Sequence, residues 1–351
     1  MTDCDTLACQ YLRPIEEGEI ALNIIHESIQ SVQVGEGITF KNLTMFPILK
    51  DSTDQSEYVT LDEALNSGTA RVAEVSESGS VPDLQFLNEG DVPILLLDGE
   101  ELVGAKQNRV LNLTILAPAH EAITIPVSCV EHGRWSHRSD EFSSEDRVHY
   151  SRGRSAKAAS VSMSMASGGS RRSDQAEVWE NISAKSGRMR VSSPTDSMSD
   201  IYEQRKQSMT GFVGAFSHSP QQVGAMFGID GAIAGVDLFD DPGTLSKLLS
   251  KLVRSYALDA IETTEEEDKP TEVEEAQRFL AILAAVQTQE FPAVGRGTDY
   301  RLKDQMVSGG ALVDKGHVIH LGAFPYVSES SGGRSTRRAR MMSASQRRHR
   351  H

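Results

Sequence analysis

Between residues 70 and 130 the chain is divided into short apolar or alternating runs by Gly, Pro, Asn and Asp. Runs of this length between turn-forming residues are typical of β-strands. Five or six strands at this spacing predict a sandwich or a barrel-like β unit. The runs are 71–75, 83–87, 93–97, 101–105, 109–116 and 122–130.

The segments on either side of this region add helices and hairpins. Alternation at Ile20, Leu22 and Ile24 predicts that strands open the fold, and the order Thr-Leu-Asp-Glu at 60–63 predicts a capped short helix. Beyond residue 173 helical periodicity alternates with two Asp/Gly hairpins, which we expect to pair with each other around the helices. We therefore predict an α+β fold: an N-terminal, mostly antiparallel β unit followed by helices and β-hairpins, packed as one extended domain.

Four segments follow from these patterns. We predict a β-rich unit over 10–134, a flexible insert rich in Ser and Arg over 135–172, and an α+β unit over 173–325. The last segment, 329–351, contains seven Arg and one Glu, and we expect it to be a disordered basic tail.

Charge restricts the partners. The whole chain of 351 residues carries −15, and the tail carries +6, so the remainder carries −21. Such a body repels polyanions, which argues against a nucleic-acid or anionic membrane surface over most of the molecule. The tail alone could contact nucleic acid or an acidic partner, and it could equally be a solubilising end.

The cysteine content and the N-terminus point to the cytoplasm. Cys4, Cys9 and Cys129 are too few for a disulfide framework, no secretory signal precedes Arg13, and no apolar run is long enough to span a bilayer. The chain has no P-loop, Rossmann fingerprint, Gly-x-Ser-x-Gly elbow or His-Glu-x-x-His motif. The donors around Glu131 and His132 fit no metal template, so we predict no metal site and leave the cofactor undefined.

The densest polar cluster lies around the ends of the predicted strands. Period-two geometry sends the adjacent carboxylates Glu100 and Glu101 to opposite faces of a strand. Carboxylates are candidates for general acid–base work, whereas amides, Arg and aromatic rings suit sugar hydroxyls, bases and phosphates. The candidate catalytic residues are Glu100, Glu101 and Glu131, and the candidate ligand-binding residues are Gln107, Asn108, Arg109, Arg134, Trp135 and Arg254.

Each candidate also has a structural explanation. The two Glu residues could be a solvated turn, Arg134 and Trp135 could form a cation–π pair at the sheet edge, and Arg254 could pair with the β unit. Cys129, between apolar neighbours, is predicted to be buried rather than nucleophilic. Burial with internal pairing would favour a structural role, and convergence on an open cleft would favour an enzyme or a binder.

Several long motifs resemble those of one prokaryotic family, the ARG and rhodanese-phosphatase-superfamily-associated proteins. They are LLLDGEELVGAKQNRVLN at 95–112, IPVSCVE at 125–131, GRW at 133–135, SDQ at 173–175, SDIYE at 199–203, VDLF at 236–239 and LVRSYALDA at 252–260. The resemblance covers roughly residues 10–325. The family name implies an association with ADP-ribosylglycohydrolases and rhodanese-like phosphatases, and hence a role near ADP-ribose or NAD-derived nucleotides.

Two functions follow as expectations. The first is a cytosolic protein that binds an ADP-ribose-like or NAD-derived nucleotide, with hydrolysis or transfer of that ligand left open. The alternative is a non-catalytic sensor or adaptor in which the polar cluster is structural.

Overall fold

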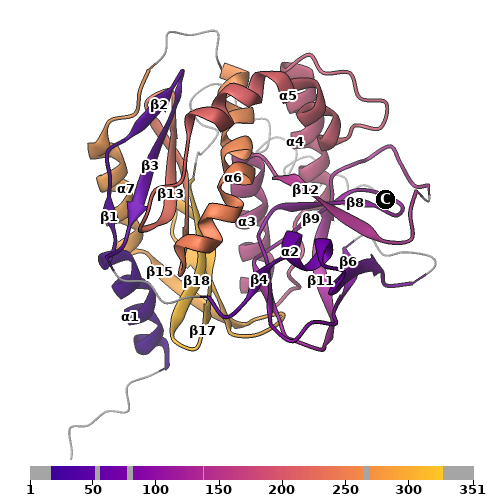
Figure 1. Ribbon diagram of the computed structural model, residues 1–351, viewed down its shortest axis with the longest axis horizontal. Helices are drawn as coiled ribbons and strands as arrows, with labels where there is room; N and C mark the ends of the chain where they lie inside the picture. Colours follow the sequence, from indigo (N-terminus) through magenta and orange to yellow (C-terminus); the bar gives the residue numbers. More distant parts are fainter. Residues whose placement is uncertain (1–16, 52–55, 77–81, 137, 264–268, 327–351) are drawn as a thin grey trace, which may run out of the picture.

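The computed structural model describes residues 17–51, 56–76, 82–136, 138–263 and 269–326 (Figure 1). Its largest element is a sheet of nine strands in the order β1-β3-β13-β14-β18-β17-β16-β15, with β2 paired to β3. The strands are β1 (Gln33–Val34), β2 (Ile38–Phe40), β3 (Leu43–Leu49), β13 (Gln222–Ile229), β14 (Ala232–Phe239), β15 (Gln287–Pro292), β16 (Thr298–Lys303), β17 (Val307–Asp314) and β18 (His317–Pro325). Neighbouring strands of this sheet are antiparallel throughout its described residues.

A second β assembly lies beside the large sheet, on the right of Figure 1. Six strands run in the order β12-β8-β9-β11-β6-β5, and a bridge between Ala73 and Glu141 links the two ends of this order. The curled arrangement confirms the expected barrel-like unit. Its strands are β5 (Ala70–Glu74), β6 (Asp83–Asn88), β8 (Glu100–Gly104), β9 (Arg109–Leu111), β11 (Ala122–Cys129) and β12 (Phe142–Val148), and a smaller sheet contains β4 (Val59–Thr60), β7 (Ile94–Leu96) and β10 (Ile115–Ala117).

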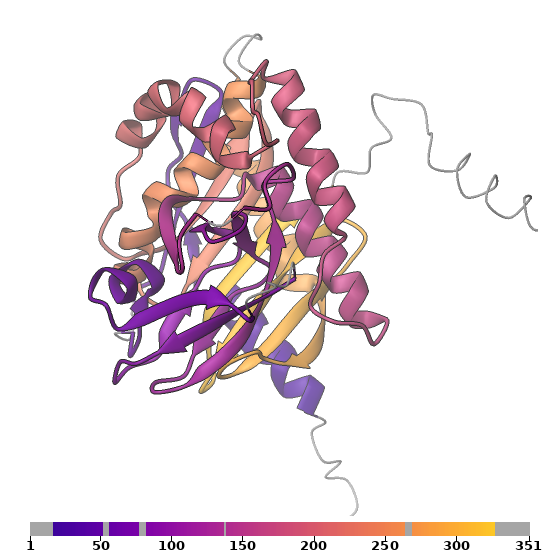
Figure 2. The same ribbon diagram turned by 90° about the vertical axis from the view of Figure 1, so that its right-hand side faces the viewer.

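Helices cover both faces of the large sheet. α1 (Glu17–Gln30) and α7 (Val273–Ala285) pack on the outer face, and α6 (Pro242–Thr263) and α3 (Ser151–Ala166) lie between the large sheet and the second β assembly (Figures 1 and 2). α4 (Gln175–Arg188) and α5 (Met198–Ala215) extend this inner layer, and α2 (Leu61–Asn66) caps the second assembly. Separate apolar clusters fill the outer and inner faces, so the sheet is buried on both sides.

Local signals were predicted well. Thr60 and Glu63 form the expected capping box at the start of α2. The β13–β14 hairpin turns at Asp230 and Gly231, whose φ values of 52° and 82° fit the expected Asp-Gly turn. The two later hairpins pair through β14 and β18, as expected.

Two local predictions are wrong. Residues 20–24 belong to helix α1, not to a strand, because Ile25 and Ile29 repeat at helical spacing and bury one face. The predicted flexible insert over 135–172 contains β12 and α3. Its helix escaped detection because buried positions of α3 carry Arg154 and Lys157, which hide the apolar period.

Candidate functional site

Most of the predicted site residues meet in one buried network beside β11. The Glu131 carboxylate accepts hydrogen bonds from the Arg134 guanidinium at 2.8 Å and from the Asn108 backbone N–H at 3.2 Å. Arg134 also donates to the Asn108 side-chain oxygen at 3.0 Å. Gln107 donates to the Glu131 carbonyl at 2.9 Å and accepts from Arg109 at 3.2 Å. Most of these groups pair with one another inside the protein, but Nε and Nη2 of the buried Arg109 have no hydrogen-bond partner among the described residues.

The two adjacent carboxylates do point to opposite sides and are both buried rather than solvated. Glu100 accepts from Lys251 of α6 at 2.8 Å, whereas Glu101 pairs with Arg147 and accepts from Ser199 at 2.7 Å. Burial raises the pKa of both carboxyls, although the cations beside them act in the opposite direction. Ser199 also accepts from Asn108, which connects Glu101 to the Glu131 network.

The remaining candidates lie at the margins. Trp135 is 51% exposed and packs against Lys106 and Arg109, at 5.6 and 5.9 Å from its ring centre, rather than against Arg134. Arg254 is separate from the network and pairs with Asp146 of β12 at 2.8 Å. Cys129 is buried as predicted, and burial raises the pKa of its thiol.

A second buried group of charges was missed by sequence reasoning. We call it the Asp237 cluster: Asp98, Arg154, Lys157, Asp237 and His320. Arg154 donates two hydrogen bonds to Asp237, and His320 bridges Asp237 and the Thr114 hydroxyl. Burial opposes ionisation, yet Arg154 and His320 hold the pKa of Asp237 well below its usual value. This cluster joins α3 to the large sheet and to the loop before β8.

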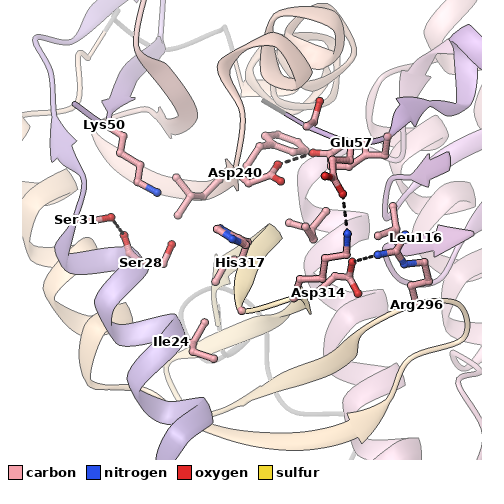
Figure 3. Close-up of a pocket in the computed structure, with 18 of the residues that line it drawn as sticks. Ile24, Ser28, Ser31, Lys50, Glu57, Leu116, Asp240, Arg296, Asp314 and His317 are labelled. Atoms are coloured by element: carbon pink, nitrogen blue, oxygen red, sulfur yellow. Dashed lines mark hydrogen bonds and ion pairs between the residues drawn. The ribbon is translucent and has the colours of Figure 1, made fainter. Parts of the chain in front are cut away.

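Among the cavities bordered by the residues that the structure describes, none of nucleotide size is lined by either group. The space beside the Asp237 cluster has a volume of about 10 Å³, enough for a water molecule. A large cavity lies elsewhere, between α1, the end of β3, the segment just before β4 and the β17–β18 hairpin, with a volume of about 590 Å³ (Figure 3). That volume falls within the range of roughly 300–1,000 Å³ typical of small-molecule sites.

Asp240, directly after β14, lies in this cavity. Its carboxylate accepts a 2.5 Å hydrogen bond from the Tyr58 hydroxyl, which in turn accepts from Thr244 at 3.2 Å. Burial raises the pKa of Asp240 to about 6, with Asp241 adding to the shift and Tyr58 and His317 reducing it. The cavity therefore contains a carboxyl group that changes charge near neutral pH.

The cations of the cavity differ in how they are engaged. Arg296 pairs with Asp314 at 2.6 Å, and Lys315 pairs with Glu57 at 2.7 Å. Lys50, at the end of β3, forms no side-chain hydrogen bond or ion pair with any residue that the structure describes. Figure 3 shows its ammonium group extending toward the hollow that Asp240 and His317 also border. This lysine is available to an anionic ligand.

Two adjacent acids, Asp240 and Asp241, precede Pro242, the first residue of helix α6. Asp241 alone caps this helix, since its carboxylate accepts from the Thr244 backbone N–H at 2.9 Å. One sequence signal could have identified Asp240: two acids precede this helix, although a single N-cap residue is enough. Lys50 and His317 carry no local signal, because the fold brings them together from distant strands.

Within the described ranges no group of three or more His, Cys, Asp or Glu side chains is placed to hold a metal ion. Over the same residues no helix combines the length and the apolar character needed to cross a bilayer.

Comparison with known proteins adds one result. A family model described as the ARG and Rhodanese-Phosphatase-superfamily-associated Protein domain matches residues 31–324, which confirms the resemblance drawn from the motifs. No match was found among curated proteins or among solved structures.

Proposed function

The chain belongs to the ARG and Rhodanese-Phosphatase-superfamily-associated Protein family, and from this premise we propose that it binds an ADP-ribose-like or NAD-derived nucleotide. We assign the ligand to the cavity between α1 and the β17–β18 hairpin rather than to the Glu131 network. The Glu131 network pairs most of its own donors and acceptors, with Nε and Nη2 of Arg109 as the exceptions, so a ligand there would have to break several buried hydrogen bonds.

The observation that carries the proposal is the pair of groups offered to one cavity: the ammonium of Lys50 and the carboxylate of Asp240. A nucleotide of this class carries phosphate charge and ribose hydroxyls. Lys50 supplies the charge-assisted hydrogen bond that a phosphate oxygen accepts, and Asp240 accepts from hydroxyl groups. The −21 body discourages larger polyanions, which favours a small ligand held by a local cation.

The sensor or adaptor alternative draws support from the internal pairing of the buried Glu and Arg side chains. If Glu100, Glu101, Glu131 and Arg134 only stabilise the fold, the family motifs at 95–112 and 125–135 maintain a scaffold. A scaffold of this kind is compatible with ligand binding in the cavity. In that case the protein is a sensor, and the nucleotide bound in the cavity is the signal that it detects.

Isothermal titration calorimetry with ADP-ribose, NAD and AMP tests the proposal. The wild-type chain should bind at least one of them, and Lys50→Ala should weaken that binding by roughly 10- to 100-fold, the value of one lost charge-assisted hydrogen bond. Lys303→Ala removes an exposed lysine at the end of β16, outside the cavity, and serves as the matched control with unchanged affinity. Absence of binding to all three ligands would overturn the proposal, as would equal effects of the two variants.

A cytoplasmic location remains part of this proposal, based on the low cysteine content. The predicted basic tail, 329–351, lies outside the described residues. We propose that it contacts nucleic acid or an acidic partner, and deletion of 329–351 should then abolish salt-dependent retention on immobilised nucleic acid or on an acidic protein. Retention unchanged by the deletion would contradict this role.

A further inference from the structure

The cations that line the cavity are not equally available to a ligand. Two of its cations, Arg296 and Lys315, are neutralised by Asp314 and Glu57, so Lys50 is the cation left for a phosphate among the described residues. Enzymes that transfer a phosphoryl group surround it with several cations, because charge spreads over its equatorial oxygens. A single available lysine suits a phosphate that is held in place while another bond reacts.

Asp240 provides the complementary group. Its carboxylate is fixed on one oxygen, Oδ1, by the Tyr58 hydroxyl, and no described side chain donates to Oδ2. Tyr58 is itself buried and held by Thr244, so the orientation of the carboxylate is set by two successive hydrogen bonds. A carboxylate directed in this way can accept a proton from water and can stabilise positive charge on a nearby carbon.

These two features match the cleavage of a glycosidic bond. Its transition state resembles an oxocarbenium ion, and carboxylates stabilise the positive charge that develops at the anomeric carbon. We propose that the cavity hydrolyses the N-glycosidic bond of a cationic ribosyl nucleotide such as NAD, with Asp240 as the general base and Lys50 holding a phosphate. This inference rests on the proposed nucleotide binding.

The reaction is balanced without any further reactant. The oxygen of water forms a bond to the anomeric carbon, and the bond between that carbon and the ring nitrogen of the base breaks. The electron pair of the broken bond neutralises the pyridinium nitrogen, so nicotinamide leaves neutral and requires no proton. Asp240 accepts the proton from water and later releases it to solvent.

The raised pKa of Asp240 supports this role, because a carboxylate with a pKa of about 6 is a stronger base than an ordinary Asp and is still ionised at neutral pH. The groups that face it are Tyr58, Asp241 and His317. The other ionisable groups of the cavity are Glu27, Lys50, Glu57, Arg296, Asp314 and Lys315.

Release of nicotinamide from NAD, followed by chromatography, tests the inference on the full chain. Asp240→Asn keeps the shape and an acceptor for Tyr58, so the rate should fall roughly 10²- to 10⁴-fold, while the Kd for ADP-ribose rises by no more than about tenfold, the value of one hydrogen bond to a ribose hydroxyl. Glu180→Gln, an exposed carboxyl-to-amide change on α4, is the matched control and should leave the rate unchanged. The rate of the wild type should decline below a pH of about 6, as Asp240 becomes protonated.

Tyr58→Phe provides a second, independent variant. Loss of the Tyr58 hydroxyl removes a hydrogen bond that lowers the pKa of Asp240. The decline in rate should therefore move to higher pH. A purely structural role for Tyr58 would lower the rate without moving the profile.

The outcomes separate the two proposals. Binding of ADP-ribose or NAD without nicotinamide release would overturn the hydrolysis and leave the binding function intact. Unchanged turnover in Asp240→Asn would exclude Asp240 as the base. If Asp240→Asn does not fold, an unmoved pH profile in Tyr58→Phe overturns the assignment instead. Failure of the wild type to bind any of these nucleotides removes the proposed function, and the hydrolysis falls with it.

Discussion

The guanidinium of Arg154 in α3 donates two hydrogen bonds to the carboxylate of Asp237 in β14, at 3.0 and 2.6 Å, and neither side chain is exposed to solvent. The pair lies between the large sheet and the second β assembly. Its two charges are desolvated, so each depends on the other for compensation.

Breaking this pair should be costly. Asp237→Ala leaves Arg154 buried without its main partner and should lower the free energy of unfolding by about 3–5 kcal/mol, measured by urea denaturation. Arg254→Ala breaks the more accessible pair with Asp146 and should cost about 1 kcal/mol or less. Equal losses of unfolding free energy in the two variants would mean that burial does not increase the contribution of the pair to stability.

The Glu131 network should contribute to stability and not to ligand affinity. Arg134→Ala removes the cation bonded to Glu131 and Asn108 and should destabilise the fold by about 3 kcal/mol, with the Kd of the bound nucleotide unchanged. Trp135→Ala changes a half-exposed neighbour and should cost about 1 kcal/mol or less. A folded Arg134→Ala chain that no longer binds would place the ligand at this network instead of the cavity.

Asp240 should make stability depend on pH with a defined sign. Its pKa is about 6 in the folded chain and about 3.9 when unfolded, so the folded state binds the proton more tightly. Its stabilising contribution is complete below pH 4 or so and is lost as the pH rises to about 6. Asp240→Asn should therefore gain stability relative to the wild type across this interval, by up to about 3 kcal/mol. Denaturation curves at pH 4, 5, 6 and 7 measure the difference in unfolding free energy between the variant and the wild type. A difference that does not change with pH would refute the raised pKa of Asp240.

Gly153 should tolerate no side chain, despite its place in a helix. A Cβ there would lie 2.3 Å from Nε2 of the buried His149, so Gly153→Ala should destabilise the chain by about 1–3 kcal/mol in spite of the better helix propensity of Ala. Gly187→Ala in α4 meets no atom within 4 Å and should instead stabilise by up to about 1 kcal/mol. Thermal denaturation distinguishes the two; stabilisation by both would show that His149 moves aside freely.

The sequence predicted those features that depend on neighbours along the chain. The capping box at Thr60 and the Asp230-Gly231 turn are local, and most residues of the Glu131 network lie within 101–135, close enough for their spacing to reveal a shared site. Helix α3 could not be recognised, because charged residues occupy its buried face and find partners on other elements. The cavity was equally hidden, since Lys50, Asp240 and His317 meet only after the large sheet has formed.

The order of strands in the large sheet also has a consequence for synthesis of the chain. β3 ends at Leu49, but its partner β13 begins at Gln222, so more than half of the polypeptide must leave the ribosome before this pair can form. During that interval β3 can pair along one edge with β1 and β2, but its other edge has no neighbour, while the strands between residues 70 and 148 already have partners close by in sequence. A nascent chain that stops before β13 presents an apolar strand with one open edge, which makes incomplete translation products natural targets for chaperones and proteases.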